Sequence, residues 1–454
     1  MEKVTIDVPK KLEELARLLN SPLYIVGGIC RDKLAGLKCE QRDWDICAPV
    51  SAELLSATAE KCGFTISAIY KRTGTVRLLA DNEEYEFTSF RTDKYEKGKH
   101  TPSSVEFTDD IILDAQRRDF KCNAVYYDVL RKIFIDPLGG IADIEKRQLS
   151  TVVCASKVFG EDGLRLMRLC RISAQTGFTP TEECLSGARE HCHLISDVAV
   201  ERIWAELNAI LHADEKYNID GAQYKGLELL KESGVLKQIL PELALGDKME
   251  QRKDFHDYDV LEHSLRCVLY ADKRVRLSAL LHDVAKPYCL NNFGNFHKHE
   301  EYGAQIAMEI CRRLRVPVAL AQKACRLIEL HMYDLSGATS TNKVRKFIVN
   351  NYEDIEELLL LKQADYSACK DNTNEAPCVS KWKKIMSEMK NEGVPFTLKE
   401  LNVKGNELIE AGISPCETCK TLKFLLEQTA MGCVKNSTKE LIAHALAKHF
   451  GSIS

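Results

Sequence analysis

Two aspartates separated by one residue, Asp43 and Asp45, constrain this chain more than any other feature, because they follow a glycine pair, Gly27-Gly28. Side chains alternate between the faces of a β-strand, so both carboxylates are expected on one face, as a pair of Mg²⁺ ions requires. The glycines come after an apolar run, Leu23–Val26, and before a helix start, where backbone N–H groups can surround a phosphate. Strand, glycine pair, helix and second strand together predict a site for metal-assisted phosphate chemistry.

Composition sets the broad class of the protein. A length of 454 residues allows roughly two to four domains with their own cores. The N-terminus is charged and amphipathic and no apolar run is long enough to span a membrane, so we expect a cytoplasmic protein without a membrane partner. The eighteen cysteines are scattered, which favours reduced thiols, and the CxxC pair Cys416–Cys419 is interpreted as incidental, with a redox or zinc role as the alternative. The net charge of −4 neither supports nor excludes an RNA substrate, because that depends on local basic surface.

The chain changes character at residues 136–140, a segment rich in glycine and proline. Before it, strand pairs such as Thr75–Ala80 with Tyr85–Phe90 are mixed with helices. After it nearly everything is helical, with Val200–Leu211 and Val260–Tyr270 as examples. We expect an α+β protein with a mixed-sheet head (1–140), an all-α neck and body (141–250), a further helical domain (251–370) and a helical tail (371–454).

A third carboxylate, Glu86, lies in a strand between Tyr85 and Phe87, which point to the opposite face. An acid buried on a central strand is costly unless it meets a cation, whereas an exposed edge residue needs no such partner. In the presence of Asp43 and Asp45, we expect Glu86 to complete the metal site.

Two adjacent arginines, Arg117 and Arg118, precede Asp119, Asn123 and an apolar strand. Such pairs are usually solvated, but these fall where a triphosphate would lie if this sheet carries the site. The planar guanidinium group gives paired hydrogen bonds to phosphate, which predicts a triphosphate contact here.

The segment EDGLRLMRLCR predicts a helix with Asp162 and Arg165 as neighbours, and with Arg168 and Arg171 continuing at three-residue spacing. One interpretation is an ordinary salt bridge. The other is base reading, in which the carboxylate accepts from the exocyclic amine of cytosine or adenine and the guanidinium donates to the neighbouring ring acceptor. Guanine and uracil present the opposite polarity there, so such a pair would select CTP and ATP without a template.

These stretches resemble the class II CCA-adding enzymes and the bacterial poly(A) polymerases, within the polymerase-β nucleotidyltransferase superfamily. The resemblance rests on VGGICRDKLAG, RDWD, RTGTV, YEFTSFRTD, RRDFKCNAVYYD, DPLGG and EDGLRLMRLCR, in the family's order up to residue 171. It implies that Asp43, Asp45 and Glu86 are catalytic and that Asp43 and Asp45 bind Mg²⁺. It also implies that Asp162 and Arg165 recognise the incoming base. The residues expected to bind the nucleotide are Gly27, Gly28, Arg31, Arg118, Asp119, Asn123, Asp162, Arg165, Arg168 and Arg171.

The chain departs from the family pattern at three places. Lys121 stands where threonine usually follows RRDF, and Cys30 stands where valine or a similar residue is usual. The segment Lys99-His100-Thr101-Pro102 replaces the basic pair that often precedes proline in a loop that influences the switch from C to A addition. The departure at residues 99–102 concerns the identity of the added nucleotides more than the polymerase chemistry.

A second polar set lies in the helical part of the chain. His282 and Asp283 are adjacent within the apolar run LLHDVAKP, and histidines and carboxylates from separate helices commonly hold a divalent metal. The run resembles the HD phosphohydrolase superfamily, which implies a divalent transition metal. The implied ligands are His263, His282, Asp283 and Asp365, with His299 and His331 matching the extra histidines of two-metal members.

Three other positions of this region carry less information. Asn295 stands where the HD superfamily more often has histidine. His256 and His297 are expected to be packed or exposed rather than metal ligands, since most single histidines are.

We therefore expect a tRNA nucleotidyltransferase that adds C, C and A to tRNA 3′ ends from CTP and ATP and releases pyrophosphate. Alternatives within this class are a poly(A) polymerase and an enzyme that adds only CC or only A. From other classes come an HD metal-dependent phosphohydrolase whose head only binds RNA, and a non-catalytic RNA-binding protein. The paired aspartates and the EDxxR segment argue against both, because a binding module needs neither. The sequence gives no indication of oligomeric state.

Overall fold

The computed structural model describes residues 4–38, 43–94 and 103–451, and the chain divides into two compact units, Met1–Ala244 and Leu245–Ser454. This division lies close to the expected boundary at residue 250, and the finer boundaries at 140 and 370 stay predictions. Within the described residues, no helix has the length and apolar character needed to cross a membrane.

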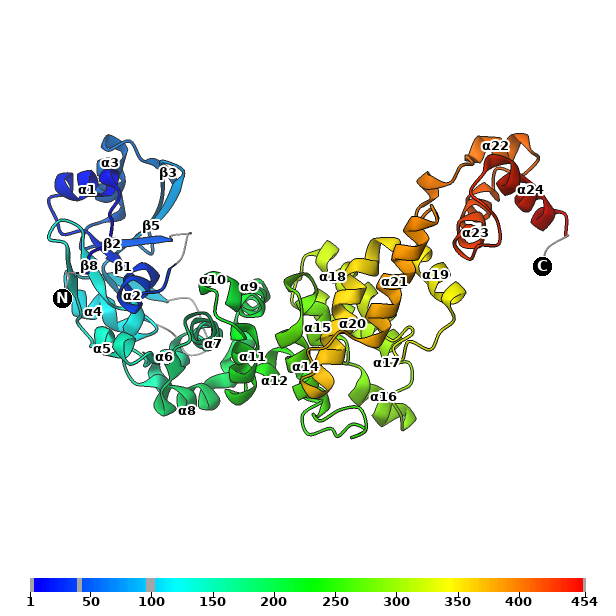
Figure 1. The fold of residues 1–454 in the computed structure, drawn as a ribbon. Coiled ribbons are helices and arrows are strands. Elements are labelled where there is room, and N and C mark those ends of the chain that lie inside the picture. The colour runs from blue at the N-terminus through cyan, green and yellow to red at the C-terminus, as the bar shows by residue number, and fades with distance from the viewer. Residues whose placement is uncertain (1–3, 39–42, 95–102, 452–454) are drawn as a thin grey trace. The chain divides into compact units, whose positions relative to one another are not determined.

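The first unit begins with a mixed seven-stranded sheet in the order β3-β4-β5-β2-β1-β8-β9, drawn in blue and cyan in Figure 1. β2 and β5 run parallel, and the other neighbouring strands run antiparallel. The strands are β1 (Tyr24–Val26), β2 (Trp44–Ala48), β3 (Thr65–Tyr70), β4 (Thr75–Ala80), β5 (Glu83–Ser89), β8 (Tyr126–Asp128) and β9 (Ile133–Ile135), and a separate hairpin pairs β6 (Arg91–Lys94) with β7 (Ser104–Phe107).

The β4–β5 hairpin follows the expected pairing, but β5 begins earlier than Tyr85 because the turn is tighter than expected. Asp81 and Asn82 alone form the turn, with φ of 53° and 65°. Positive φ at both central residues matches the twist of a two-residue hairpin, and aspartate and asparagine tolerate this conformation.

Helices complete the first unit. Those of the head are α1 (Lys10–Leu18), α2 (Gly28–Ala35), α3 (Ala52–Lys61), α4 (Ile111–Gln116) and α5 (Gly140–Glu145). Those that follow are α6 (Ala155–Glu161), α7 (Leu164–Thr176), α8 (Glu182–His191), α9 (Val200–Leu211), α10 (Ala213–Tyr217), α11 (Ala222–Glu232), α12 (Val235–Ile239) and α13 (Pro241–Ala244). α7 packs against α9, α10 and α11, which places a helical layer next to the head.

The described residues of the second unit contain helices and no strand. They are α14 (Val260–Tyr270), α15 (Arg276–Leu281), α16 (Lys286–Phe293), α17 (His299–Arg313), α18 (Val318–Leu330), α19 (Thr341–Asn350), α20 (Ile355–Lys370), α21 (Pro377–Asn391), α22 (Gly405–Glu410), α23 (Thr418–Ala430) and α24 (Thr438–His449). α14 and α20 pack against each other, as do α17 and α18. The expected helix Val260–Tyr270 has the predicted bounds.

Candidate active site and a second polar cluster

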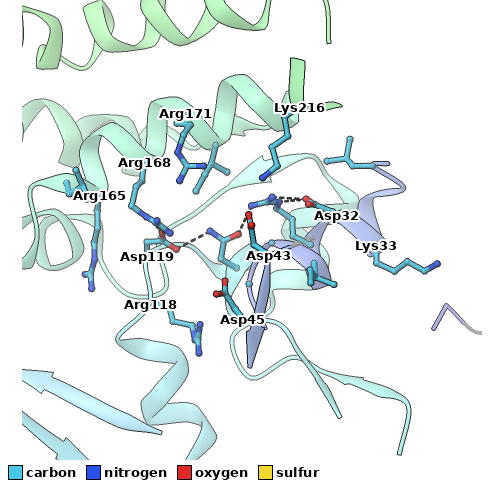
Figure 2. A pocket seen from close by; sticks show the side chains of 18 of the residues that line it. Asp32, Lys33, Asp43, Asp45, Arg118, Asp119, Arg165, Arg168, Arg171 and Lys216 are labelled. Atoms are coloured by element: carbon cyan, nitrogen blue, oxygen red, sulfur yellow. Dashed lines mark hydrogen bonds and ion pairs between the residues drawn. The ribbon is translucent and has the colours of Figure 1, made fainter. Parts of the chain in front are cut away.

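Asp43 and Asp45 flank Trp44 at the start of β2. The Trp44 side chain is buried and stacks on Tyr85, with 6.0 Å between the ring centroids. Asp43 and Asp45 are exposed and line one cavity (Figure 2). Alternation along the strand thus sends the large apolar ring into the core and leaves both carboxylates on the open side.

Glu86 lies beside this pair but not within the cavity lining. It is in register with Asp45 across the parallel strands β2 and β5, so the two side chains share one face of the sheet. Although β5 is an interior strand, the Glu86 side chain is 48% exposed and lies 3.5 Å from Arg77 Nε. The structure therefore places a half-exposed carboxylate here rather than a buried one.

The pKa of the Asp45 carboxyl reflects its position in the cavity lining. Burial raises its pKa to about 6, and the carboxylates of Glu86 and Asp43 act in the same direction, against the opposing effect of Arg118 and Arg168. Water reaches this carboxylate although protein surrounds it on most sides. A divalent cation would favour its charged form, and a set of carboxylate oxygens suits a hard ion.

Gly27 makes the close approach of the glycine turn to Asp45 sterically allowed. Its φ is +82°, and a Cβ atom at this position would lie 3.0 Å from Asp45 Oδ2. Only glycine meets both conditions without strain. It is also the N-cap of α2, which therefore begins next to Asp45.

The cavity has a volume of about 930 Å³ and carries an excess of positive charge. Its cationic residues are Arg31, Lys33, Lys38, Arg117, Arg118, Arg165, Arg168, Arg171, Arg202 and Lys216, and its acidic residues are Asp7, Asp32, Asp43, Asp45, Asp119 and Asp162. A concave, positively charged site attracts a polyanion even though the chain as a whole has a net charge of −4.

Asp119 connects the head with α7. Its two oxygens accept hydrogen bonds from Arg168 Nε at 2.7 Å and from Asn123 Nδ2 at 3.1 Å. Burial alone would raise the pKa of Asp119, but Arg168 and Asn123 hold it well below its usual range. Both predicted nucleotide-binding residues, Asp119 and Arg168, are thus fixed by each other.

Arg31 is largely occupied by protein partners. Its Nη1 donates to Asn123 Oδ1 at 2.8 Å, and its Nε and Nη2 donate to Asp32 at 2.9 and 2.7 Å. Tyr217 on α10 accepts from Arg31 Nη2 at 3.2 Å and donates to Asp32. Arg31 therefore ties the glycine turn to the helices after the head, in addition to any contact with a ligand.

Arg118 is held by a buried carboxylate, Asp114. The guanidinium donates through Nη2 to Asp114 Oδ2 at 2.9 Å and lies over the Tyr126 ring, and Arg117 Nε donates to Asp114 Oδ1 at 2.7 Å. These contacts fix two adjacent cations at the cavity wall, near Asp45 (Figure 2).

Asp162 and Arg165 both line the cavity, but Asp162 precedes the helix that carries Arg165. Asp162 Oδ1 accepts at 3.0 Å from the backbone N–H of Leu164, the first residue of α7. Arg165 donates to the carbonyls of Val158 and Arg117 at 3.1 and 2.6 Å. Each side chain thus has a structural contact besides its predicted contact with the base.

The remaining positions singled out in the sequence are placed as follows. Arg171 lines the cavity and donates to Glu206 at 2.5 Å. Cys30 is buried and its thiol lies 3.3 Å from the carbonyl of Ile25, which accounts for a small side chain there. Residues 99–102 lie outside the described part of the chain.

The second cluster lies in the second unit and brings together the six predicted residues: His263 on α14, His282 and Asp283 directly after α15, His299 at the start of α17, His331 directly after α18, and Asp365 on α20. His263 Nε2 lies 3.2 Å from His282 Nε2 and 3.1 Å from Asp365 Oδ1. His299 Nε2 lies 3.3 Å from Asp283 Oδ1 and from His331 Nε2. The side chains of this cluster are almost fully buried.

Backbone carbonyls orient three of the four imidazoles. The Nδ1 atoms of His282, His299 and His331 lie 2.8, 2.8 and 2.6 Å from carbonyl oxygens one turn earlier. A carbonyl only accepts, so Nδ1 carries the proton and Nε2 presents its lone pair to the cluster, which is the arrangement of metal-binding histidines. Burial also lowers the pKa of His331 to about 3, with the same effect from His299 and His282, so this ring is neutral.

Comparison with known proteins assigns three consecutive parts of the chain. Residues 23–150 match the poly A polymerase head domain, residues 177–245 match the probable RNA and SrmB-binding site of polymerase A, and residues 260–379 match the HD domain. The A-adding tRNA nucleotidyltransferase of Deinococcus radiodurans is 29% identical over an alignment of 367 residues, and the match covers 76% of this chain and 76% of that protein. A head domain and an RNA-binding region of the poly(A) polymerase type, followed by an HD domain, are therefore the consecutive parts of this nucleotidyltransferase.

Solved structures share the fold of this nucleotidyltransferase. The CCA-adding enzyme of Bacillus stearothermophilus in complex with CTP has a TM-score of 0.69 at 22% identity, covering 98% of this chain and 99% of that one. The Thermotoga maritima CCA-adding enzyme complexed with tRNA has a TM-score of 0.60 at 18% identity, covering 97% and 94%. The head and HD domains both imply dependence on divalent metal ions.

Several cavity residues of this nucleotidyltransferase were not expected from its sequence. Asp32 lies inside the glycine motif VGGICRDKLAG, next to the predicted residue Arg31, and this position could have identified it as a cavity residue. Arg202 and Lys216 come from α9 and α10, and nothing local in their helices marks them. Only the tertiary contacts of α7 with those helices bring them to the cavity.

Proposed function

We propose that this enzyme adds C, C and A to the 3′ ends of tRNA from CTP and ATP. The observation that carries the proposal is the single cavity that joins two carboxylates, an excess of cations and the Asp162–Arg165 pair. The A-adding relative and the CCA-adding fold neighbours support a tRNA substrate.

Each group of side chains has a task in this reaction. Asp43 and Asp45, with Glu86 beside them, would hold the divalent ions, Mg²⁺ in our proposal, which when bound activate the ribose hydroxyl and stabilise the leaving pyrophosphate. Arg118 and Arg168, which both line the cavity, neutralise the triphosphate. Asp162 accepts from the exocyclic amine of cytosine or adenine, which guanine and uracil lack at that position.

The proposal is tested with three tRNA substrates: one lacking CCA, one ending in C and one ending in CC. Each is incubated with one labelled nucleoside triphosphate at a time, and the 3′ ends are sequenced. CCA addition predicts two C residues on the first substrate and one A on the third. Addition to the third substrate alone would indicate an A-adding enzyme, and a long A tract would indicate a poly(A) polymerase.

We propose a second function for the His/Asp cluster, which we call the HD centre and define as His263, His282, Asp283, His299, His331 and Asp365. The proposal is that it binds a divalent transition metal and supports hydrolysis of phosphate esters. It is supported by the three imidazoles whose Nε2 atoms are oriented toward Asp283 and Asp365. Metal analysis of the purified protein tests binding, and release of inorganic phosphate from nucleoside monophosphates tests hydrolysis.

A cytoplasmic location is also part of our proposal. The described cysteines are all free, which suits a reducing compartment. Fractionation of cells with an antibody to the protein tests it.

A further inference from the structure

One ring nitrogen next to the HD centre has no hydrogen-bond partner. The Nδ1 atoms of His282, His299 and His331 are bonded to carbonyls, but Nδ1 of His263 is buried and unpaired among the described residues. The whole His263 side chain has no exposed surface. Buried polar atoms almost always have a partner, and an ion is one of the groups that supplies it.

Two further metal-ligating side chains lie next to His263. One ligand atom each from His256, His263 and Cys369 lies within 4.8 Å of the other two. The His256 and His263 rings pack at 86° with 4.8 Å between centroids, and His256 Nδ1 is also buried without a hydrogen-bond partner. Two imidazoles, each with a buried Nδ1 that has no hydrogen-bond partner among the described residues, thus lie together with a thiol.

The fold fixes all three side chains. Cys369 lies one turn after Asp365 on α20, so both side chains are on one face of that helix, and α14, which carries His263, packs against it. The segment that carries His256 is attached at both ends: the Asp257 N–H donates to the Cys369 carbonyl at 3.0 Å, and Gln251 Oε1 accepts from Lys286 at 2.7 Å. All three side chains therefore lie on segments that the rest of the fold holds in place, and they can bind an ion without rearrangement of the backbone.

We propose that His256, His263 and Cys369 form a thiolate-containing subsite for a thiophilic divalent cation such as Zn²⁺, next to the HD centre. Two imidazoles and a thiolate are ligands that zinc and cobalt favour, and water completes the tetrahedron. His263 belongs to both sites, since its Nε2 faces His282 and Asp365 while Nδ1 is free, and the inference rests to this extent on the proposed HD centre. Filling the subsite releases the Cys369 thiol proton to solvent, and an ion on each nitrogen also displaces the His263 ring proton.

Cobalt titration of the metal-free, full-length protein tests the subsite. Bound Co²⁺ absorbs in the visible region with nitrogen and oxygen ligands alone, whereas a thiolate-to-cobalt charge-transfer band in the near ultraviolet requires a cysteine ligand. We expect both signals in the wild type and loss of the charge-transfer band in Cys369→Ser and His256→Asn. The matched controls Cys192→Ser, a half-buried cysteine of the first unit, and His297→Asn, an exposed histidine, should keep it.

The outcomes separate this inference from the HD centre. Visible absorption without a charge-transfer band in the wild type would overturn the subsite and leave the HD centre in place. Absence of any cobalt absorption would overturn both. A charge-transfer band that survives in Cys369→Ser would assign the thiolate to another cysteine.

A second measurement needs no variant and so does not depend on correct folding of one. Bound Zn²⁺ should slow alkylation of Cys369 in the wild type on the order of tenfold, as read by mass spectrometry of its peptide, because a coordinated thiolate is withdrawn from reaction. Alkylation of Cys192 in the same sample should not change. Equal rates at Cys369 with and without Zn²⁺ would overturn the subsite.

Discussion

The active-site cavity and the HD centre both combine carboxylates with cationic or ionisable partners, but they differ in access and in ligand type. The cavity is open, about 930 Å³ in volume, and offers carboxylate oxygens among many cations. The HD centre is almost fully buried and offers imidazole nitrogens that backbone carbonyls orient. A site that admits and releases a triphosphate in every cycle must be open and positively charged, whereas a site that retains an ion is better closed and pre-oriented.

The partners of the cations show the same difference. In the cavity, Arg118 and Arg168 are held by Asp114 and Asp119 and still face the open space. In the HD centre, Lys286 Nζ lies 2.6 Å from Asp283 Oδ2, so this carboxylate oxygen already forms an ion pair within the protein. The arginines of the cavity therefore remain positioned to bind an anionic ligand. Lys286 in the HD centre instead neutralises a buried carboxylate.

The largest expected effect is on the cavity alone. Asp43→Ala or Asp45→Ala should reduce nucleotide addition on the order of a thousandfold or more, because several kcal/mol of metal-derived transition-state stabilisation is lost. Single-turnover incorporation of labelled CTP measures it. The Asp81→Ala variant, on the exposed β4–β5 turn, is the control, and near-normal rates in Asp43→Ala and Asp45→Ala would refute the metal-site assignment.

Substitutions in the HD centre should affect metal binding there and leave nucleotide addition in the cavity intact. His282→Ala and Asp283→Ala should each lower metal affinity of the second unit roughly 10- to 100-fold or more, since loss of even an outer-sphere partner has an effect of this size. Nucleotide addition should stay unchanged. Metal analysis together with the incorporation assay checks both, and metal content equal to that of the wild type would show that the cluster is not a metal site.

Next in size is the discrimination between nucleotides. Asp162→Ala should lower the preference for CTP and ATP over UTP and GTP by roughly 10- to 100-fold, because the amine of the correct base loses its acceptor. The measurement is kcat/KM for all four nucleotides.

Asp162→Asn is the informative partner, because the asparagine Oδ1 can still accept from the Leu164 N–H and so preserve this contact. If the carboxylate reads the base, both variants lose discrimination. A role restricted to the Leu164 contact would leave Asp162→Asn with wild-type ratios and only Asp162→Ala with reduced stability.

The smallest expected effect isolates one steric contact. Gly27→Ala and Gly36→Ala should each destabilise the protein by about 1 kcal/mol, because both glycines have positive φ. Only Gly27→Ala should also reduce kcat several-fold, because its Cβ would press on Asp45 Oδ2, whereas a Cβ at Gly36 meets nothing within 4 Å. Thermal melts and kcat of the two variants give the comparison, and equal kcat values would remove the special role of Gly27.

Local patterns predicted the parts of this fold that local interactions determine. β4 and helices α9 and α14 have the expected bounds, because alternation of period two and apolar spacing of period 3.6 are properties of the segments themselves. The paired aspartates were recognisable for the same reason, since a short motif contains the strand, the turn and both ligands.

Tertiary packing determined what the sequence did not reveal. Tyr217 lies 185 residues from Asp32, its hydrogen-bond partner, and no periodicity connects them. The sequence also gave no reason to separate His256 from other single histidines, because its position beside His263 depends on a segment attached to the end of α20. The contact of Asp162 with the Leu164 N–H at the start of α7 is likewise not encoded by the spacing of the arginines.

The contacts of Arg31, Asp32 and Tyr217 have a consequence for how such enzymes can be recombined. An excised head ending near residue 140 would keep Asp43 and Asp45 but lose Tyr217 and Arg168, which are the partners of Asp32 and Asp119 that lie outside the head. Grafting this head onto the helices of a relative would leave Asp119 without its guanidinium partner and Asp32 without the Tyr217 hydroxyl unless both partner positions moved with it. The head and the neck should therefore come from the same parent enzyme. Chimeric enzymes should retain activity only when their crossover lies after residue 217.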